Sequence, residues 1–221
     1  METTESPARA PAGHDPAKRL QILEGAKAVF DRMGFDAASM NDICHESGVS
    51  KSTLYVYFRS KEELFAALVS EMRDRKIEMV AQTLDDPTDP AGVLMRMGVQ
   101  LAKIMTSPHT MRANRTIIAV ATRMPEIGQT FYTEGPVRGS ENLTRYLEKA
   151  VAAGTLKIDD PRMAAAQFGE LALAGMFRCR LFLGEVEPPS EEEIERTVKS
   201  AVRLFMAGYG VDRTGEKSSA G

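Results

Sequence analysis

The sequence is poor in the residues that mark several large classes of protein. Its 221 residues include two cysteines, Cys44 and Cys179, and no tryptophan. Two cysteines cannot build a disulfide framework, so a reducing compartment is expected and the chain is predicted to be cytoplasmic. Its start lacks the basic and apolar regions of a secretion signal, and no stretch approaches the roughly 18 apolar residues of a membrane-spanning helix. We therefore expect a protein without a membrane partner.

Motifs for catalysis and metal binding are also scarce. The three histidines, His14, His45 and His109, do not stand in a pattern typical of nucleophilic catalysis. Cys44, His45 and Glu46 are consecutive but lack a second pair of ligands at a usable spacing, so a zinc site is not expected. The sequence also has no glycine-rich loop of the kind that holds phosphates. We predict neither an enzyme nor a metal or cofactor site.

The net charge is small and negative, with 28 basic and 31 acidic residues giving −3. Mild acidity taken alone argues against a nucleic-acid partner, because such domains are usually basic. The charges are unevenly placed, however. Residues 47–61 hold three cations and no acid, whereas acids gather at 85–86 and 191–193. Local charge governs docking, so the net charge does not exclude DNA and instead predicts weak non-specific affinity.

Apolar residues recur with a helical period, and the alternation typical of strands is absent. A first helix is expected to end at Gly34 in the left-handed conformation. Ser39, Ser50 and Ser60 are predicted to cap three helices that begin within about 21 residues, with Gly48 in the turn between the first two. The helix that Ser60 caps is expected to run to about residue 84. Further helices are expected at 90–106, 109–124, 126–153 with a kink or split at Pro136, 161–183 and 190–208.

This pattern predicts an all-α fold with two domains. A three-helix, helix-turn-helix N-terminal domain is joined by a shared helix to a larger C-terminal helical bundle. The predicted parts are a disordered arm (1–16), the helix-turn-helix domain (17–64), a connecting helix (65–84), the larger bundle (85–210) and a disordered tail (211–221).

The helix-turn-helix segment carries the clearest functional signal. Four apolar residues are spaced to form its core: Ile43, Val49, Leu54 and Phe58. Five polar or aromatic residues remain on the outer side of its second helix: Lys51, Ser52, Thr53, Tyr55 and Tyr57. Such side chains can reach base edges and phosphates, and Lys61 at the start of the next helix can neutralise a phosphate. Alternatively the tyrosines are packing residues and the lysines ordinary solvated surface, because helix-turn-helix geometry also occurs in proteins that never bind nucleic acid.

The sequence from 18 to 64 resembles the tetracycline-repressor (TetR) family of transcriptional regulators. The matching residues are Ile22-Leu23, Ala26, Phe30, Gly34, Ile43, Gly48-Val49-Ser50, Leu54-Tyr55, Tyr57-Phe58 and Lys61-Glu62-Glu63-Leu64. The resemblance implies a homodimeric DNA-binding repressor whose C-terminal domain binds a small molecule. It also implies phosphate contacts by Ser39 and Tyr57, with Lys61 beside them, and a position in or over the major groove for Ser50, Lys51, Ser52, Thr53 and Tyr55. Cys44 to Ser47 depart from the small residues that members often have there.

In that setting Lys51 is a candidate for guanine O6 and N7, and the Thr53 methyl for a thymine methyl. Two copies related by a two-fold axis would place the reading helices one DNA turn apart, so a palindromic operator is expected.

The region after residue 85 resembles the AefR-like C-terminal domains of the same family, through Met124-Pro-Glu-Ile127, Phe131, Glu134-Gly-Pro136, Gly154 and Asp160-Pro161. The family pattern puts the dimer interface on the last two predicted helices. Its predicted residues are Phe168, Leu171, Ala172, Gly175, Ile194, Val198, Ala201 and Phe205, with Ala172 and Gly175 allowing close helix approach. These residues can equally form the core of one monomer.

An apolar ligand site is predicted in the same bundle. Its candidate residues are Met105, Met111, Ile118, Phe131, Phe168 and Met176, although methionine at helical spacing is also common core. Arg115, Arg178 and Arg180 can face an anionic ligand or form ion pairs, and Cys179 is either a redox sensor or a small buried residue.

The sequence as a whole predicts a homodimeric repressor. A small apolar or amphipathic effector would release it from a palindromic double-stranded DNA operator. The alternative is a DNA-binding activator or adaptor without an effector.

Overall fold

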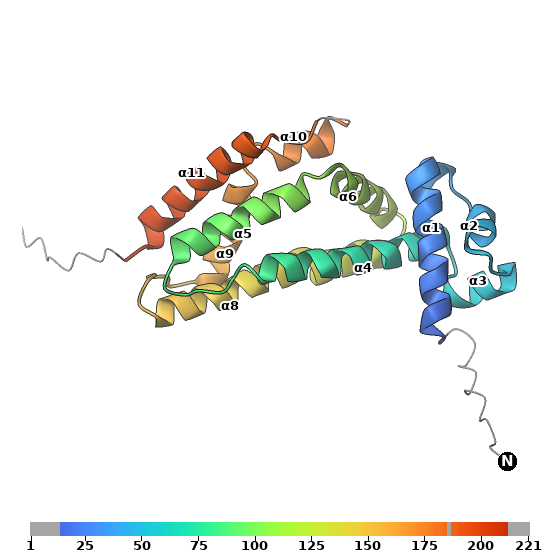
Figure 1. Cartoon of the computed structure of the whole chain (residues 1–221), viewed down its shortest axis with the longest axis horizontal. Helices are drawn as coiled ribbons and strands as arrows, with labels where there is room; N and C mark the ends of the chain where they lie inside the picture. The colour runs from blue at the N-terminus through green and yellow to red at the C-terminus, as the bar shows by residue number, and fades with distance from the viewer. Residues whose placement is uncertain (1–13, 185–186, 212–221) are drawn as a thin grey trace, which may run out of the picture. The chain divides into compact units, whose positions relative to one another are not determined.

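The structure is a computed structural model that describes residues 14–184 and 187–211 (Figure 1). These residues form helices joined by short turns, with one isolated β-bridge between Leu156 and Gly210, so the predicted all-α fold is confirmed. The chain divides into two compact units, one ending at Met72 and the other beginning at Arg73. Nearly all of the predicted disordered arm and tail lies outside the described residues. None of the described helices combines the length and apolar character needed to cross a membrane.

The first unit contains α1 (Pro16–Ala37), α2 (Met40–Ser47), α3 (Lys51–Tyr57) and the first part of α4 (Lys61–Ala81). Its predicted caps are present. The Ser39 hydroxyl accepts from the Asp42 amide while the Asp42 carboxylate accepts from the Ser39 amide, and the Ser50 hydroxyl accepts from the Thr53 amide. Gly48 ends α2 in the left-handed conformation, with φ of 65° and ψ of 24°, as predicted. Gly34 has φ of 77° and ψ of 167° and breaks the helical geometry inside α1, which continues to Ala37 instead of ending at Gly34.

The core of this unit forms as the apolar spacing predicts. Ile43 and Leu54 are completely buried, and Val49 and Phe58 are nearly so. Helices α1 and α2 approach closely because Gly25 has no side chain: a Cβ there would lie 2.6 Å from the Ser47 Cβ. This close contact was not evident from the sequence. It fixes α2 against α1 and so positions the turn that leads into α3.

The second unit continues with helices that largely follow the predicted order. They are α5 (Pro90–Met105), α6 (Pro108–Ala121), α7 (Pro125–Tyr132), the π-helical turn η1 (Thr133–Val137), α8 (Arg138–Ala152), α9 (Pro161–Ala172), α10 (Phe177–Phe182) and α11 (Glu191–Tyr209). Pro136 lies inside η1, so the long helix predicted at 126–153 is divided where a proline removes a hydrogen-bond donor.

The prediction of a single helix at 161–183 is wrong. Helical geometry ends at Ala172 and resumes at Phe177, and Gly175 between them has φ of 75°. A left-handed residue cannot continue a right-handed helix, so the chain turns here and the second-last predicted helix becomes two shorter ones.

The larger core of this unit is built from α5, α8, α9 and α11. Phe168 is completely buried and meets Phe205 edge to face, with ring centroids 5.5 Å apart. Close helix approach occurs at Gly98 of α5, where a Cβ would lie 2.6 Å from a methyl of Val198, whereas a Cβ at Gly175 would have no neighbour within 4 Å. The end of α11 is held by a hydrogen bond of 2.8 Å from the Lys157 amide to the Tyr209 carbonyl.

Candidate nucleic-acid interface

Helix α3 exposes most of its polar residues around the surface that its buried anchor leaves free. Leu54 has no exposed surface, whereas Lys51, Ser52 and Tyr55 are exposed and Thr53 is half-buried. An α-helix turns through about 200° in two residues, so Ser52 lies almost opposite Leu54 on the helix. The predicted groove-facing residues are thus brought together on one short helix whose other side is fixed in the core.

Three hydroxyl groups gather at the start of α3. The Ser50 Oγ lies 2.9 Å from the Ser52 Oγ and 2.8 Å from the Thr53 Oγ1, and it also accepts from the Thr53 amide. Hydroxyl groups both donate and accept, so this cluster can adapt to either polarity of a base edge or a phosphate. Ser50 is therefore partly occupied as a helix cap, while Ser52 is the more outward of the three.

Tyr57 is half-buried, and its hydroxyl accepts a hydrogen bond of 3.2 Å from the Asp15 amide. Asp15 in turn caps α1 by accepting from the amides of Ala17 and Lys18. Because the Tyr57 oxygen is an acceptor in this contact, its own proton is left to donate. This geometry is compatible with the phosphate contact expected for Tyr57.

The Ser39 hydroxyl, unlike that of Tyr57, already donates its proton within the first unit. Its hydroxyl lies 2.5 Å from the Asp42 carboxylate, and this bond lowers the pKa of Asp42 below its ordinary value. The serine proton is thereby directed to a carboxylate, so a phosphate contact by Ser39 requires the hydroxyl to rotate away from Asp42.

Lys61 is bonded within the first unit, and its predicted phosphate contact stays a prediction. Its Nζ lies 2.8, 3.1 and 2.9 Å from the carbonyl oxygens of Phe35, Asp36 and Ala38, and 4.6 Å from the centroid of the Phe35 ring. An ammonium group has three N–H donors, and three carbonyls at the end of α1 are within reach of them. The structure therefore places Lys61 as a tie between the end of α1 and the start of α4.

We expect Lys61→Met to lower the free energy of unfolding by about 1.5–3 kcal/mol, because hydrogen bonds from a charged donor are lost while the aliphatic stem remains. The salt dependence of operator binding should keep its slope. Urea unfolding and titrations at several salt concentrations check this, with Lys27→Met as control, since Lys27 forms an exposed ion pair with Asp31. If the variant were as stable as the wild type and its slope of log affinity against log salt concentration fell by about one per half-site, Lys61 would contact phosphate as predicted.

Sequence reasoning missed one residue of this face, Val56. It is 55% exposed and lies four residues after Ser52, on the same line of the helix opposite Leu54. The signal was available in the spacing, because a residue two positions from a buried anchor points outward. Tyr57, which was predicted to lie on the outer side of this helix, is half-buried.

The predicted ligand residues of the second unit differ in their surroundings and in their burial. Phe168 belongs to the main core, Met176 to a separate cluster with Ala102, Ile194 and Val198, and Ile118 is 57% exposed. Met111 is buried, and Met105 and Phe131 are half-buried. That these six residues line one cavity stays a prediction, because apolar spacing identifies a buried face without identifying its neighbours.

The three arginines considered for an anionic ligand are occupied by protein groups. Arg115 of α6 donates to the carbonyls of Arg180, Leu181 and Gly184 at the end of α10. Arg180 is nearly buried and donates to the carbonyls of Met176 and Glu187 and to the Glu193 carboxylate. Arg178 forms an exposed ion pair with Glu170. These arginines were expected either to face an anionic ligand or to form ion pairs. The structure shows ion pairs and contacts with carbonyl groups at a helix end.

Most of the predicted dimer residues are buried within one chain, so little of their surface remains for a second copy, and their place in a dimer interface stays a prediction. Phe168, Ala172, Ile194, Val198, Ala201 and Phe205 have at most 3% of their surface exposed, and Leu171 is half-buried. The exposed apolar residues of α9, α10 and α11, with the residue that follows α10, are Met163, Phe182, Leu183 and Leu204, at 55%, 80%, 71% and 55%.

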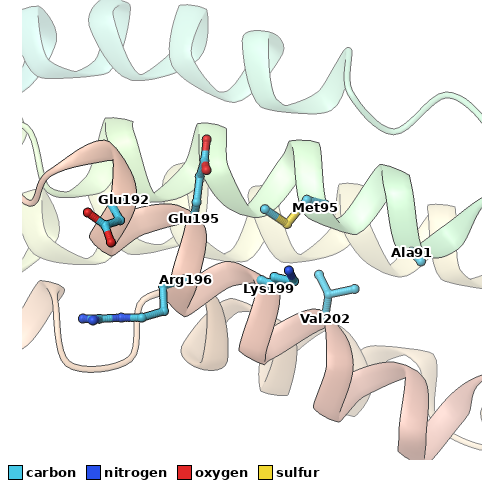
Figure 2. Close-up of a pocket in the computed structure, with 7 residues that line it drawn as sticks. All are labelled: Ala91, Met95, Glu192, Glu195, Arg196, Lys199 and Val202. Carbon is cyan, nitrogen blue, oxygen red and sulfur yellow. The ribbon is translucent and has the colours of Figure 1, made fainter.

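An open cleft of about 570 Å³ lies between α5 and α11 (Figure 2). Ala91 and Met95 line it from α5, and Glu192, Glu195, Arg196, Lys199 and Val202 line it from α11. Its charged residues carry both signs in equal number, and none of the six predicted ligand residues takes part.

Family models match both units of the chain. Residues 22–68 match the model described as bacterial regulatory proteins of the tetR family, and residues 92–211 match the model described as the C-terminal domain of AefR-like transcriptional repressors. The second match alone covers more than half of the chain. The chain belongs to the TetR family. The family and the AefR-like C-terminal subgroup predicted from the sequence are both confirmed.

Relatives of this TetR-family protein include solved structures that match along nearly its whole length. A TetR-family regulator from Mesorhizobium loti has a TM-score of 0.81 at 28% identity, covering 88% of this chain and 98% of that one. The flavonoid-responsive regulator FrrA has a TM-score of 0.67 at 32% identity, covering 90% and 100%. The transcriptional activator FasR of Mycolicibacterium smegmatis is 40% identical over 72 residues, 33% of each chain. The chain spans about a third of the length of the first curated relatives it matches.

These matches make the chain a TetR-family DNA-binding transcriptional regulator, and its relatives are regulators rather than enzymes. The helix-turn-helix lies inside the N-terminal match, so the segment with the clearest chemical signal is also the segment shared with the family.

Proposed function

We propose that this TetR-family regulator is a homodimeric repressor that binds a palindromic operator. It leaves the operator when a small apolar or amphipathic molecule binds the second unit. The observation that carries the proposal is the geometry of α3. Lys51, Ser52 and Tyr55 are exposed on a helix that a completely buried Leu54 anchors in the core. Contacts to bases from such a helix can specify sequence, while phosphate contacts position it.

Dimerisation supplies what a single α3 lacks. This helix has seven residues, so one copy can reach few base pairs. Two copies around a two-fold axis, about 34–36 Å apart, read a palindrome and combine their binding free energies. The exposed apolar side chains of α9 to α11, Phe182 and Leu183 above all, support a second copy as the partner, since large exposed apolar groups commonly mark interfaces.

An effector would act by binding one arrangement of the second unit better than another. Two features support an apolar or amphipathic compound. The chain contains 13 methionines, whose flexible side chains adapt to varied apolar shapes. A relative at 32% identity is named as flavonoid-responsive, which makes a small-molecule response a reasonable proposal here.

A second candidate function is activation, or an adaptor role without an effector. The relative FasR, 40% identical over the N-terminal region, is named as an activator. The DNA-reading unit does not distinguish the two, because both need the same contacts to the operator.

The test begins with selection of an operator from a random duplex library by the full chain, followed by gel-shift titration and analytical ultracentrifugation at micromolar concentration. We expect a palindromic site and a dimer. In vitro transcription from a promoter carrying the site then separates repression from activation, and thermal-shift screening with apolar and cationic compounds finds an effector by a raised melting temperature. A monomer, or a selected site without two-fold symmetry, would reject the dimer.

A further inference from the structure

We propose that Val56 is a specificity-determining residue that recognises the C5 methyl group of a thymine in each operator half-site. The inference rests on the proposed function, because it requires that α3 lie in the major groove. Nothing in the family match itself assigns a role to this residue.

The position of Val56 on α3 carries the first step. Among the described residues of the first unit, Val56 is the most exposed large apolar side chain, at 55%, followed by Leu20, Tyr55 and Met33. It lies two residues after Leu54, which is completely buried, and four after Ser52, which is exposed. The side of α3 that points directly away from the core therefore consists of a serine and a valine.

The chemistry of valine carries the second step. Its side chain has no hydrogen-bond donor or acceptor, so it cannot bind a phosphate and cannot read the polar groups of guanine, cytosine or adenine. The thymine methyl is the apolar feature that base pairs present in the major groove. A valine at the outermost point of a reading helix thus matches one base edge and mismatches the others.

The restricted motion of valine supports the same assignment. A β-branched side chain in a helix has one strongly preferred χ1 rotamer, so its methyl groups are held in place before DNA is bound. Little side-chain freedom is lost on contact. The N-terminal half of α3, with Lys51 and Ser52, would read polar base edges, while the following turn reads a methyl group.

Replacing thymine by deoxyuridine removes the methyl group and nothing else. In the operator selected by the full chain, each thymine would be replaced in turn, in both half-sites together. We expect one symmetric pair to weaken wild-type binding about fourfold per half-site, or about fifteenfold in all, from the loss of one buried methyl on each side. Val56→Ala should bind the unmodified operator more weakly and show less than a twofold further loss at that pair.

Two variants serve as comparisons. Met33→Ala removes an exposed apolar side chain from α1 of the same unit and should retain the wild-type response to deoxyuridine. Thr53→Ser removes the Thr53 methyl group, the other candidate for a thymine methyl, and should also retain the wild-type response at this pair. Circular dichroism and thermal unfolding establish that Val56→Ala keeps the fold, as expected for an exposed position.

The outcomes separate this inference from the function on which it rests. If the operator is bound specifically but no thymine pair is sensitive, or if Val56→Ala keeps the same sensitivity as the wild type, the inference fails and the proposed function stands. If the response disappears in Thr53→Ser instead, the methyl contact belongs to Thr53 and the inference again fails. If no specific site can be selected, both fail.

Discussion

Phe168→Ala is expected to lower the free energy of unfolding of the second unit, which begins at Arg73, by about 3–5 kcal/mol. Phe168 is completely buried at the centre of the core formed by α5, α8, α9 and α11, and its ring packs edge to face on Phe205. Removing the ring loses its burial and leaves a cavity that close-packed helices fill only partly. A loss of this size is a large share of the 5–15 kcal/mol typical of a whole protein, so expression itself should suffer.

Urea unfolding followed by circular dichroism, at one fixed protein concentration, measures this effect. Leu204→Ala is the matched comparison, because Leu204 lies on α11 but is 55% exposed. Its stability should change little, while dimerisation measured by ultracentrifugation should weaken. If Phe168→Ala were instead monomeric and as stable as the wild type, the original placement of Phe168 at the dimer interface would be correct.

Lys51→Ala is expected to weaken operator binding about 30- to 25,000-fold without unfolding the protein. Lys51 is exposed at the first position of α3. A specific contact from a basic side chain contributes about 1–3 kcal/mol, and a symmetric dimer loses two such contacts at once. Gel-shift titration at one stated salt concentration measures the loss.

The way in which Lys51→Ala weakens binding identifies its partner. A contact to guanine should relax the base preference at one position of each half-site, whereas a contact to phosphate should weaken all sequences alike and lower the salt slope. Lys27→Ala, which removes an exposed cation from α1, should bind as the wild type does. A Lys51→Ala affinity within twofold of the wild type would contradict the assigned face.

The helix starts and turns of the first unit were predictable because they depend on neighbouring residues. A serine three residues before an acid or a threonine satisfies free amides at a helix start, and Gly48 supplies a left-handed turn, whatever lies elsewhere in the chain. The buried set around Leu54 followed from the helical period for the same reason.

The errors arose where tertiary packing decides. Gly175 lies within an apolar helical pattern, and glycine is tolerated inside helices, so its left-handed conformation was not evident from its neighbours. An apolar stripe on α11 shows which face is buried but not whether Phe205 meets its own chain or another. The length of a lysine side chain likewise gives no direction, so the three carbonyl groups that hold Lys61, 23–26 residues earlier in the chain, were not evident.

The bonds of Lys61 have a mechanical consequence for the DNA-reading unit. Because one ammonium joins the first turn of α4 to the end of α1, a displacement of that turn is carried into α1 instead of being absorbed at the junction. Helix α1 in turn holds α2 through the contact of Gly25 with Ser47. The unit is therefore stiff, and a pull on the start of α4 should move α3 as part of one body, with its own shape preserved.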